Sequence, residues 1–173
     1  MDQFAGPRWK AARTEYMGHH INRRTMLSAF GALAVTSLSS WPASAAPTIH
    51  VVKTSGCGCC VAWIDYLREN GFEVTSEDMP NGALVKRKMD LGISSDMASC
   101  HTAEADGYAI EGHVPAADIE RLLRERPDAV GLAVPGMPYG SPGMGPETER
   151  EAYIVFLIRK DGTTEAFSSY PAA

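Results

Sequence analysis

Hydrophobic and polar positions follow two periods along residues 48–170, and each period predicts a type of element. Patterns typical of strands occupy 48–53, 72–79, 108–114 and 129–134. Apolar residues at helical spacing occupy 59–72, 81–92 and 115–127. We expect loops at 95–107 and 135–150, and a hairpin over 152–170 that turns at Lys160-Asp161-Gly162.

This order of elements predicts an α/β fold, a three-layer domain built on a mixed sheet. The segment from 48 to 79 has the order strand, helix, strand, which is a βαβ unit. Strands that alternate with helices before a terminal hairpin, with cysteines at the first strand-helix junction, indicate a thioredoxin-like layout. Backbone N–H groups at the start of a helix stabilise thiolates, so the cysteines lie where thiol chemistry is favoured.

The first 45 residues have the features of a cleavable export signal. Arg23-Arg24 precedes an apolar stretch over 26–38, and Ala43-Ser44-Ala45 supplies the small residues of a peptidase site. The stretch is too short and too rich in small residues to span a membrane. We therefore expect residues 1–45 to be removed and residues 46–173 to form the domain, with Met17 a more natural start than Met1.

The paired arginines resemble the twin-arginine export motif, while the general secretory route stays open. Both routes predict a periplasmic protein with no membrane attachment after cleavage.

The charge of residues 46–173 argues against a nucleic-acid partner. This part of the chain has 11 basic and 19 acidic residues, a net charge of −8, whereas phosphate recognition needs clustered Lys and Arg. Its one basic run, Lys86–Lys88, is explained by a solvated helix face.

Four cysteines, Cys57, Cys59, Cys60 and Cys100, all lie after the signal region. In an oxidising compartment the default for an even number of cysteines is disulfide pairing. Cys57 and Cys60 have C-x-x-C spacing, which suits a structural disulfide, a redox dithiol or a shared metal. The third thiol, Cys59, favours a soft metal, because a dithiol catalyst gains nothing from a thiol that could pair wrongly.

Three further residues are candidate ligands for such a metal. His113 lies at the end of a predicted strand, where a histidine is either a hydrogen-bonded structural residue or a ligand. Met137 and Met144 each follow a glycine in the Pro/Gly-rich loop, where a large apolar side chain has no helical stripe to join. Thioethers are soft ligands that prefer Cu(I), so the pair indicates copper.

Four ordered motifs, KTSGCGCC, SCHTA, YAIEGHVPAADIERLL and PGMPYGSPGM, carry a resemblance over most of residues 49–167. With them the chain resembles the CopG-like proteins of bacterial copper-resistance systems, long classed as a metal-binding domain of unknown function. The resemblance implies an exported, thioredoxin-like copper binder in which the four cysteines form the metal centre. The chain departs from the family at Gly145, where an acidic residue is usual, so no carboxylate ligand is expected there.

These observations predict a copper-binding protein that sequesters or transfers Cu(I) and contributes to copper resistance. The predicted ligands are Cys57, Cys59, Cys60 and Cys100, with His113 and Met137 or Met144 completing or covering a mononuclear or polynuclear centre. The expected partners are copper ions and other periplasmic copper-handling proteins. The alternative is an enzyme, a periplasmic thiol-disulfide or copper redox oxidoreductase that uses Cys57 as nucleophile and Cys60 as resolving thiol. A third interpretation is a disulfide-stapled domain with no site.

Overall fold

The computed structural model describes residues 48–173, so the predicted signal region lies outside the described residues. Its strands are β1 (Thr48–Lys53), β2 (Glu73–Asp78), β3 (His101–Ala105), β4 (Tyr108–Glu111), β5 (Gly131–Ala133), β6 (Tyr153–Ile158) and β7 (Thr164–Tyr170). Its helices are α1 (Gly58–Glu69), α2 (Asn81–Asp90) and α3 (Ala116–Glu125), with short 3-10 turns η2 (Ser95–Met97) and η3 (Glu147–Glu149). Among these helices, none has the length and apolarity needed to cross a lipid bilayer.

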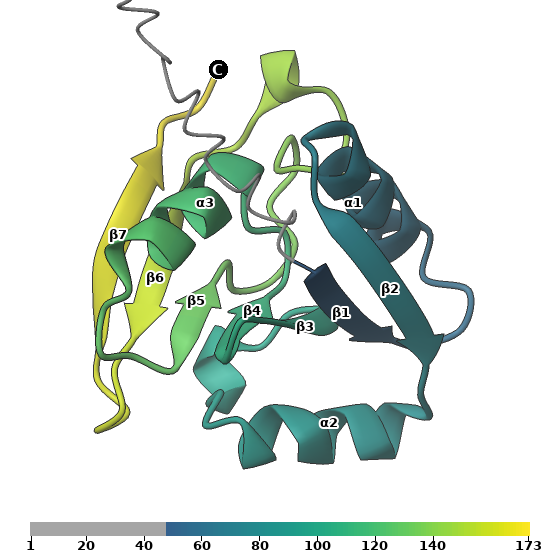
Figure 1. Ribbon diagram of the computed structural model, residues 1–173. Helices are drawn as coiled ribbons and strands as arrows, with labels where there is room; N and C mark the ends of the chain where they lie inside the picture. Colours follow the sequence, from purple (N-terminus) through teal and green to yellow (C-terminus); the bar gives the residue numbers. More distant parts are fainter. Residues whose placement is uncertain (1–47) are drawn as a thin grey trace, which may run out of the picture. The chain divides into compact units, whose positions relative to one another are not determined.

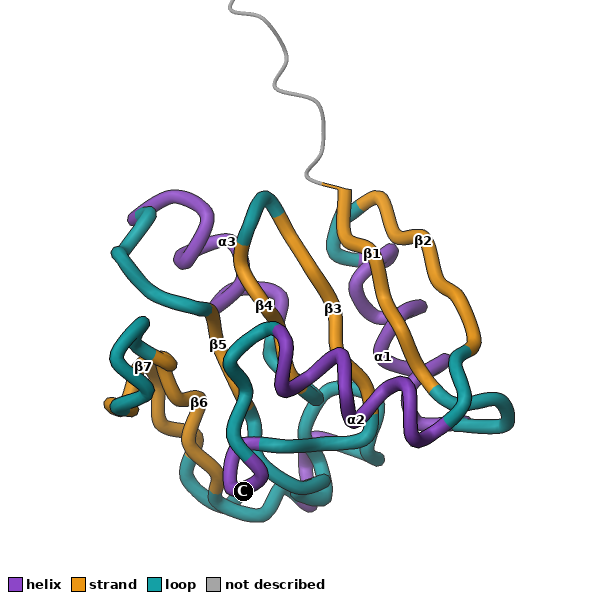
Figure 2. Tube along the Cα trace, turned by 90° about the horizontal axis from the view of Figure 1, so that it is seen from below, coloured by secondary structure: helices purple, strands orange, loops and turns teal. Residues whose placement is uncertain are grey.

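The strands form one seven-stranded mixed sheet in the order β2-β1-β3-β4-β5-β6-β7. The pairs β1–β2 and β4–β5 are parallel, and the other neighbours are antiparallel. Helices α1 and α3 cover one face of the sheet and α2 covers the other (Figures 1 and 2). The fold is therefore mixed α/β with helices on both faces of the sheet.

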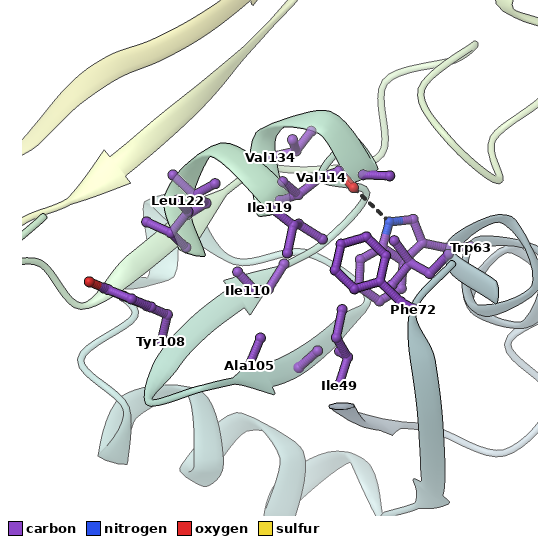
Figure 3. Packing of buried hydrophobic residues seen from close by; sticks show 14 of the residues in the cluster. Ile49, Trp63, Phe72, Ala105, Tyr108, Ile110, Val114, Ile119, Leu122 and Val134 are labelled. Carbon is purple, nitrogen blue, oxygen red and sulfur yellow. Dashed lines mark hydrogen bonds between the residues drawn. The ribbon is translucent and has the colours of Figure 1, made fainter. Parts of the chain in front are cut away.

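The larger hydrophobic core lies between the sheet and the helices α1 and α3. Figure 3 shows Trp63, Phe72 and Ile49 packed together on this side, with Ile110 and Ile119 beside them. The indole Nε1 of Trp63 donates a hydrogen bond of 2.9 Å to the carbonyl of Val114. Full burial of one large apolar side chain contributes about 1.5–3 kcal/mol, so this cluster anchors α1 firmly on the sheet.

Strand alternation sends neighbouring residues of β3 and β4 to opposite faces of the sheet. Ala103 and Ile110 join the larger core, whereas Thr102 and Glu111 contact Lys88 of α2. At this end of the sheet, the face toward α1 and α3 is thus apolar, and the face toward α2 carries polar and charged side chains.

Most predicted elements are confirmed, with three corrections. Residues 95–107 were expected to be a loop, but they contain β3, which pairs with β1 and β4. The strand predicted over 108–114 ends at Glu111, so His113 lies beyond the strand rather than at its end. Lys88 was expected on a solvated helix face, but it is buried and ion-paired with Glu111, because it faces the sheet rather than solvent.

Candidate metal centre

The first three cysteines lie where β1 turns into α1. Gly56 has a φ of +78°, which gives the chain the tight turn after β1, and Cys57 then occupies the N-cap position of α1. Cys57 and Cys60 are joined by a disulfide with Cα atoms 5.4 Å apart, while Cys59 is free. The C-x-x-C pair is therefore in its oxidised form at the start of a helix.

Cys100, the residue directly before β3, contributes a fourth sulfur to the cysteine cluster at the start of α1. Its Sγ lies 3.6 Å from that of Cys60 and 3.8 Å from that of Cys59, and Cys59 lies 3.6 Å from Cys57. All four sulfur atoms lie within 4.8 Å of one another. The pairing of Lys53 with His101 explains the meeting, because it sets the end of β1 beside the start of β3.

Two histidines also contact Cys100. The Nε2 of His113 lies 3.2 Å from Cys100 Sγ, and the Nδ1 of His101 lies 3.3 Å from it. The rings of His101 and His113 are 5.0 Å apart in an edge-on arrangement, and His101 also packs on Trp63 with centroids 4.4 Å apart. Cys100 thus belongs to two candidate ligand groups, one of the four cysteine sulfurs and one with both histidines.

Hydrogen bonding fixes the tautomer of His113. A carbonyl oxygen can only accept, so the 2.7 Å contact between His113 Nδ1 and the Pro142 carbonyl places the proton on Nδ1. The Nε2 lone pair of the neutral ring then faces the Cys100 thiol, which donates to it. The Nε2 of His101 is buried and has no hydrogen-bond partner among the described residues.

Burial favours the uncharged forms of Cys100, His101 and His113 in the absence of a metal. Desolvation lowers the pKa of His113, and it lowers the pKa of His101 well below its ordinary value, with His113 and Lys88 adding to the effect. Both imidazoles are therefore neutral and able to ligate. Desolvation, followed by the influence of Cys59, raises the pKa of Cys100 to about 12. This thiol is protonated at neutral pH, so a metal ligated by Cys100 must displace its proton.

The Pro/Gly-rich loop covers the site with its backbone. A Cβ at Gly143 would lie 2.7 Å from Trp63 N and 2.9 Å from the Cys59 carbonyl, so the loop approaches α1 too closely for a side chain there. Met144 is half-buried beside this contact, whereas Met137 is 54% exposed. The contacts from this loop to the site come from Pro142 and Gly143, and ligation by the two methionine sulfurs stays a prediction.

A pocket of about 470 Å³ reaches Cys100 from the α2 side of the sheet. Its walls include Leu84, Val85 and Met89 of α2 and the serines around η2. Its charged lining residue is Lys88, whose charge is matched by Glu111. The pocket gives small solutes a route to the fourth thiol.

The structure brings together the four cysteines and His113, which the sequence predicts as ligands, and it adds two features that the sequence did not predict. His101 was not among the predicted ligands, although the Cys-His dipeptide was a usable signal. The buried ion pair of Lys88 and Glu111 left no signal, because the two residues are 23 positions apart on different elements.

Comparison with known proteins gives matches of two kinds. A family model described as "Protein of unknown function, DUF411" matches residues 97–144, which include Cys100 and His113 but not the first three cysteines. The fold is similar to a solved structure described as "Copper resistance protein copG- Form 1", at 46% identity and a TM-score of 0.67, over 72% of this chain and 98% of that one. The corresponding "Form 2" matches at 44% identity and a TM-score of 0.67, over 73% and 99%. No curated protein matches the chain.

Proposed function

This chain belongs to the CopG-like family of copper resistance proteins, and on that premise we propose that it binds Cu(I) through its cysteine cluster. In this proposal the protein is exported to the periplasm, where it sequesters Cu(I) or transfers it to other copper-handling proteins. The observation that carries the proposal is the convergence of four sulfur atoms within 4.8 Å of one another.

The ligand chemistry suits Cu(I) better than a hard cation. Thiolate and thioether sulfur select soft metals, and neutral imidazole suits copper as well. Because one thiolate can bridge two Cu(I) ions, Cys57, Cys59, Cys60 and Cys100 are able to hold a small polynuclear cluster. In this assignment His113 binds at the Cys100 side, and Met137 or Met144 completes or covers the centre.

Full loading requires reduction of the disulfide. Reducing Cys57–Cys60 takes two electrons and two protons and yields two thiols, so in the oxidised protein Cys59 and Cys100 are the cysteines free to ligate. Binding of Cu(I) by all four sulfurs then releases the thiol protons to solvent.

The same disulfide favours a second candidate function. The order β2-β1-β3-β4, with β1 parallel to β2 and antiparallel to β3, supports a thioredoxin-like layout with the disulfide at the start of α1. In this alternative the protein is a thiol-disulfide or copper redox oxidoreductase, with Cys57 as nucleophile and Cys60 as resolving thiol.

One comparison of variants separates the two functions. Reduced wild type, Cys60→Ser and Cys100→Ser are titrated anaerobically with Cu(I) against a competing chelator, and disulfide reductase activity is measured in parallel. A copper centre predicts that both substitutions lower the copper stoichiometry to a similar extent. Full copper loading in Cys100→Ser, with reductase activity lost only in Cys60→Ser, would favour the enzyme.

Export is tested separately. We propose that the mature protein begins near Ala46, after the Ala43-Ser44-Ala45 site. N-terminal sequencing of protein recovered from the periplasm checks this, and a mature chain that retains Arg23-Arg24 would contradict it.

A further inference from the structure

We propose that Glu111, paired with Lys88, is the positioning residue that holds Cys100 against the other cysteines and His113. The inference rests on the proposed copper function for its purpose, but its geometry can be tested without metal. Glu111 is fully buried at the end of β4, on the face of the sheet opposite the cysteine cluster. It does not contact the thiols itself.

Three donors converge on the Glu111 carboxylate. Oε1 accepts 2.5 Å hydrogen bonds from Lys88 Nζ and from the backbone N–H of Ser99. Oε2 accepts a 2.6 Å bond from the hydroxyl of Thr102, which in turn accepts a 2.8 Å bond from Lys88. Lys88, Thr102 and Glu111 thus form a closed triangle, and Ser99 is attached to it.

The attachment at Ser99 matters because Ser99 directly precedes Cys100 and lies outside the paired strand β3. Its hydroxyl donates to the Gly136 carbonyl, and Gly136 N–H donates to Ala98 at 3.1 Å. The Glu111 bond is the one that ties this segment to the sheet from the α2 side. Without it, the backbone N–H of Ser99 would lose its acceptor.

The same residue also sets the position of His113. Glu111 ends β4, and Gly112 follows with its N–H donating to the His101 carbonyl at 3.1 Å. A Cβ at Gly112 would lie 2.5 Å from Ser99 Cβ, so the two segments are in direct contact at this point. One carboxylate therefore joins the segment that supplies Cys100 to the strand that leads to His113.

The carboxylate of Glu111 suits a residue that positions its neighbours better than one that mainly stabilises the fold. A buried ion pair is weak as a source of stability, since desolvation of both charges offsets much of their attraction. A carboxylate, however, is an acceptor at both oxygens and satisfies three donors at once, whereas an amide of the same shape turns an NH₂ group toward one of them. An apolar pair would pack as well but would leave Ser99 N–H unpaired.

The test compares Glu111→Gln with a matched control, Asp118→Asn. Asp118 is also a buried carboxylate, 4% exposed, but its partners Ser168 and Tyr170 lie on β7, away from the cysteines. Both changes replace a carboxylate by its amide, so both remove acceptor capacity from the interior. Only the first should alter the placement of Cys100.

The metal-free readout is the effective concentration of a Cys59–Cys100 disulfide. It is measured against a glutathione redox buffer in a background that carries Cys57→Ser and Cys60→Ser, so that only the two thiols 3.8 Å apart remain. Glu111→Gln should lower this value about tenfold, and Asp118→Asn should leave it unchanged even where it lowers stability. An unchanged value in folded Glu111→Gln would overturn the proposal.

The second readout is the Cu(I) affinity of the reduced four-cysteine protein. Glu111→Gln should weaken it about tenfold, as expected for loss of a residue that orients a ligand, while Asp118→Asn should not. If wild type binds no Cu(I), the proposed function fails but the disulfide measurement still decides the positioning role. If Glu111→Gln does not fold, Glu111→Asp decides in the same assay, because it keeps the negative charge beside Lys88 but draws the carboxylate back from Ser99 N–H by one methylene. A lowered effective concentration then supports the proposal and an unchanged one overturns it.

Discussion

Two buried carboxylates, Glu111 and Asp118, serve different regions of the protein. Glu111 is fully buried and Asp118 is 4% exposed, so both are shielded from water. Glu111 is matched by the Lys88 ammonium and accepts a backbone N–H next to Cys100. Asp118 accepts from two neutral hydroxyls, those of Ser168 and Tyr170, and joins α3 to the edge strand β7.

The different neighbours of the two carboxylates explain why they have different structural roles. Asp118 lies in the first turn of α3, where the helix dipole favours a negative charge, and the Arg121 guanidinium reaches it only through the Ser168 hydroxyl. Glu111 lies at a strand end without that help and depends on Lys88. Asp118 thus holds a helix to the sheet, whereas Glu111 connects the sheet to the residues of the candidate metal centre.

The largest effect is expected when the cation of the Glu111 region is removed. Lys88→Met keeps the apolar stem but leaves the buried Glu111 carboxylate without its counter-charge, so we expect the free energy of unfolding to fall by about 3–5 kcal/mol. Urea denaturation of the reduced protein measures the loss. A change below about 1 kcal/mol would mean that the pair behaves like a solvent-exposed one, and the contrast with Asp118 would disappear.

A smaller effect is expected at the contact between Gly112 and Ser99. Gly112→Ala combines a φ of +73° with a Cβ 2.5 Å from Ser99 Cβ, whereas Gly162→Ala has a similar φ of +84° with no atom within 4 Å. We expect a loss of about 2–4 kcal/mol at Gly112 and about 1 kcal/mol at Gly162. The Cu(I) affinity should fall only for Gly112→Ala. Equal effects at both glycines would show that backbone strain, and not the contact beside Cys100, controls stability there.

The smallest effect is expected in the Asp118 region. Tyr170→Phe removes the hydroxyl that donates to Asp118 at 2.7 Å while the stacking on Tyr153 remains. We expect the free energy of unfolding to fall by about 1–3 kcal/mol, because Ser168 still donates to the carboxylate. The Cu(I) stoichiometry and affinity should stay at wild-type values. A loss of copper binding in a folded Tyr170→Phe protein would contradict the division between the two regions.

The fold was predictable from sequence where each element carries its own pattern. β1 is a β-branched run, and β6 is an apolar run that ends at the turn residues Lys160-Asp161-Gly162 before β7. Strand β3 was missed because its sequence, HTAEA, has small and polar residues with low strand preference. It is a strand because β1 and β4 pair with it on both sides, and its small alanines fit beneath the helices.

The candidate site was predictable to the extent that its residues are chemically distinctive. Cysteines are rare, so their spacing pointed to the start of α1, and Cys100, predicted as a ligand together with them, lies 3.6 Å from Cys60. The buried roles of Lys88 and Glu111 were not predictable in this way. Charged residues are common on surfaces, and only the three-dimensional arrangement of α2 against β4 removes these two from water.

The candidate metal centre combines residues that are far apart in the sequence, and a bond between them would restrict the unfolded chain. Cys59 and Cys100 are 41 residues apart in sequence, yet their sulfur atoms are neighbours in the fold. Any bond between them that persists on denaturation, whether a disulfide or a bridging metal, closes a loop of that length. Such a loop lowers the conformational entropy of the denatured ensemble and stabilises the fold by about 4 kcal/mol. A disulfide or a metal that joins these two sulfurs would therefore act as a cross-link between the first helix and the middle of the sheet.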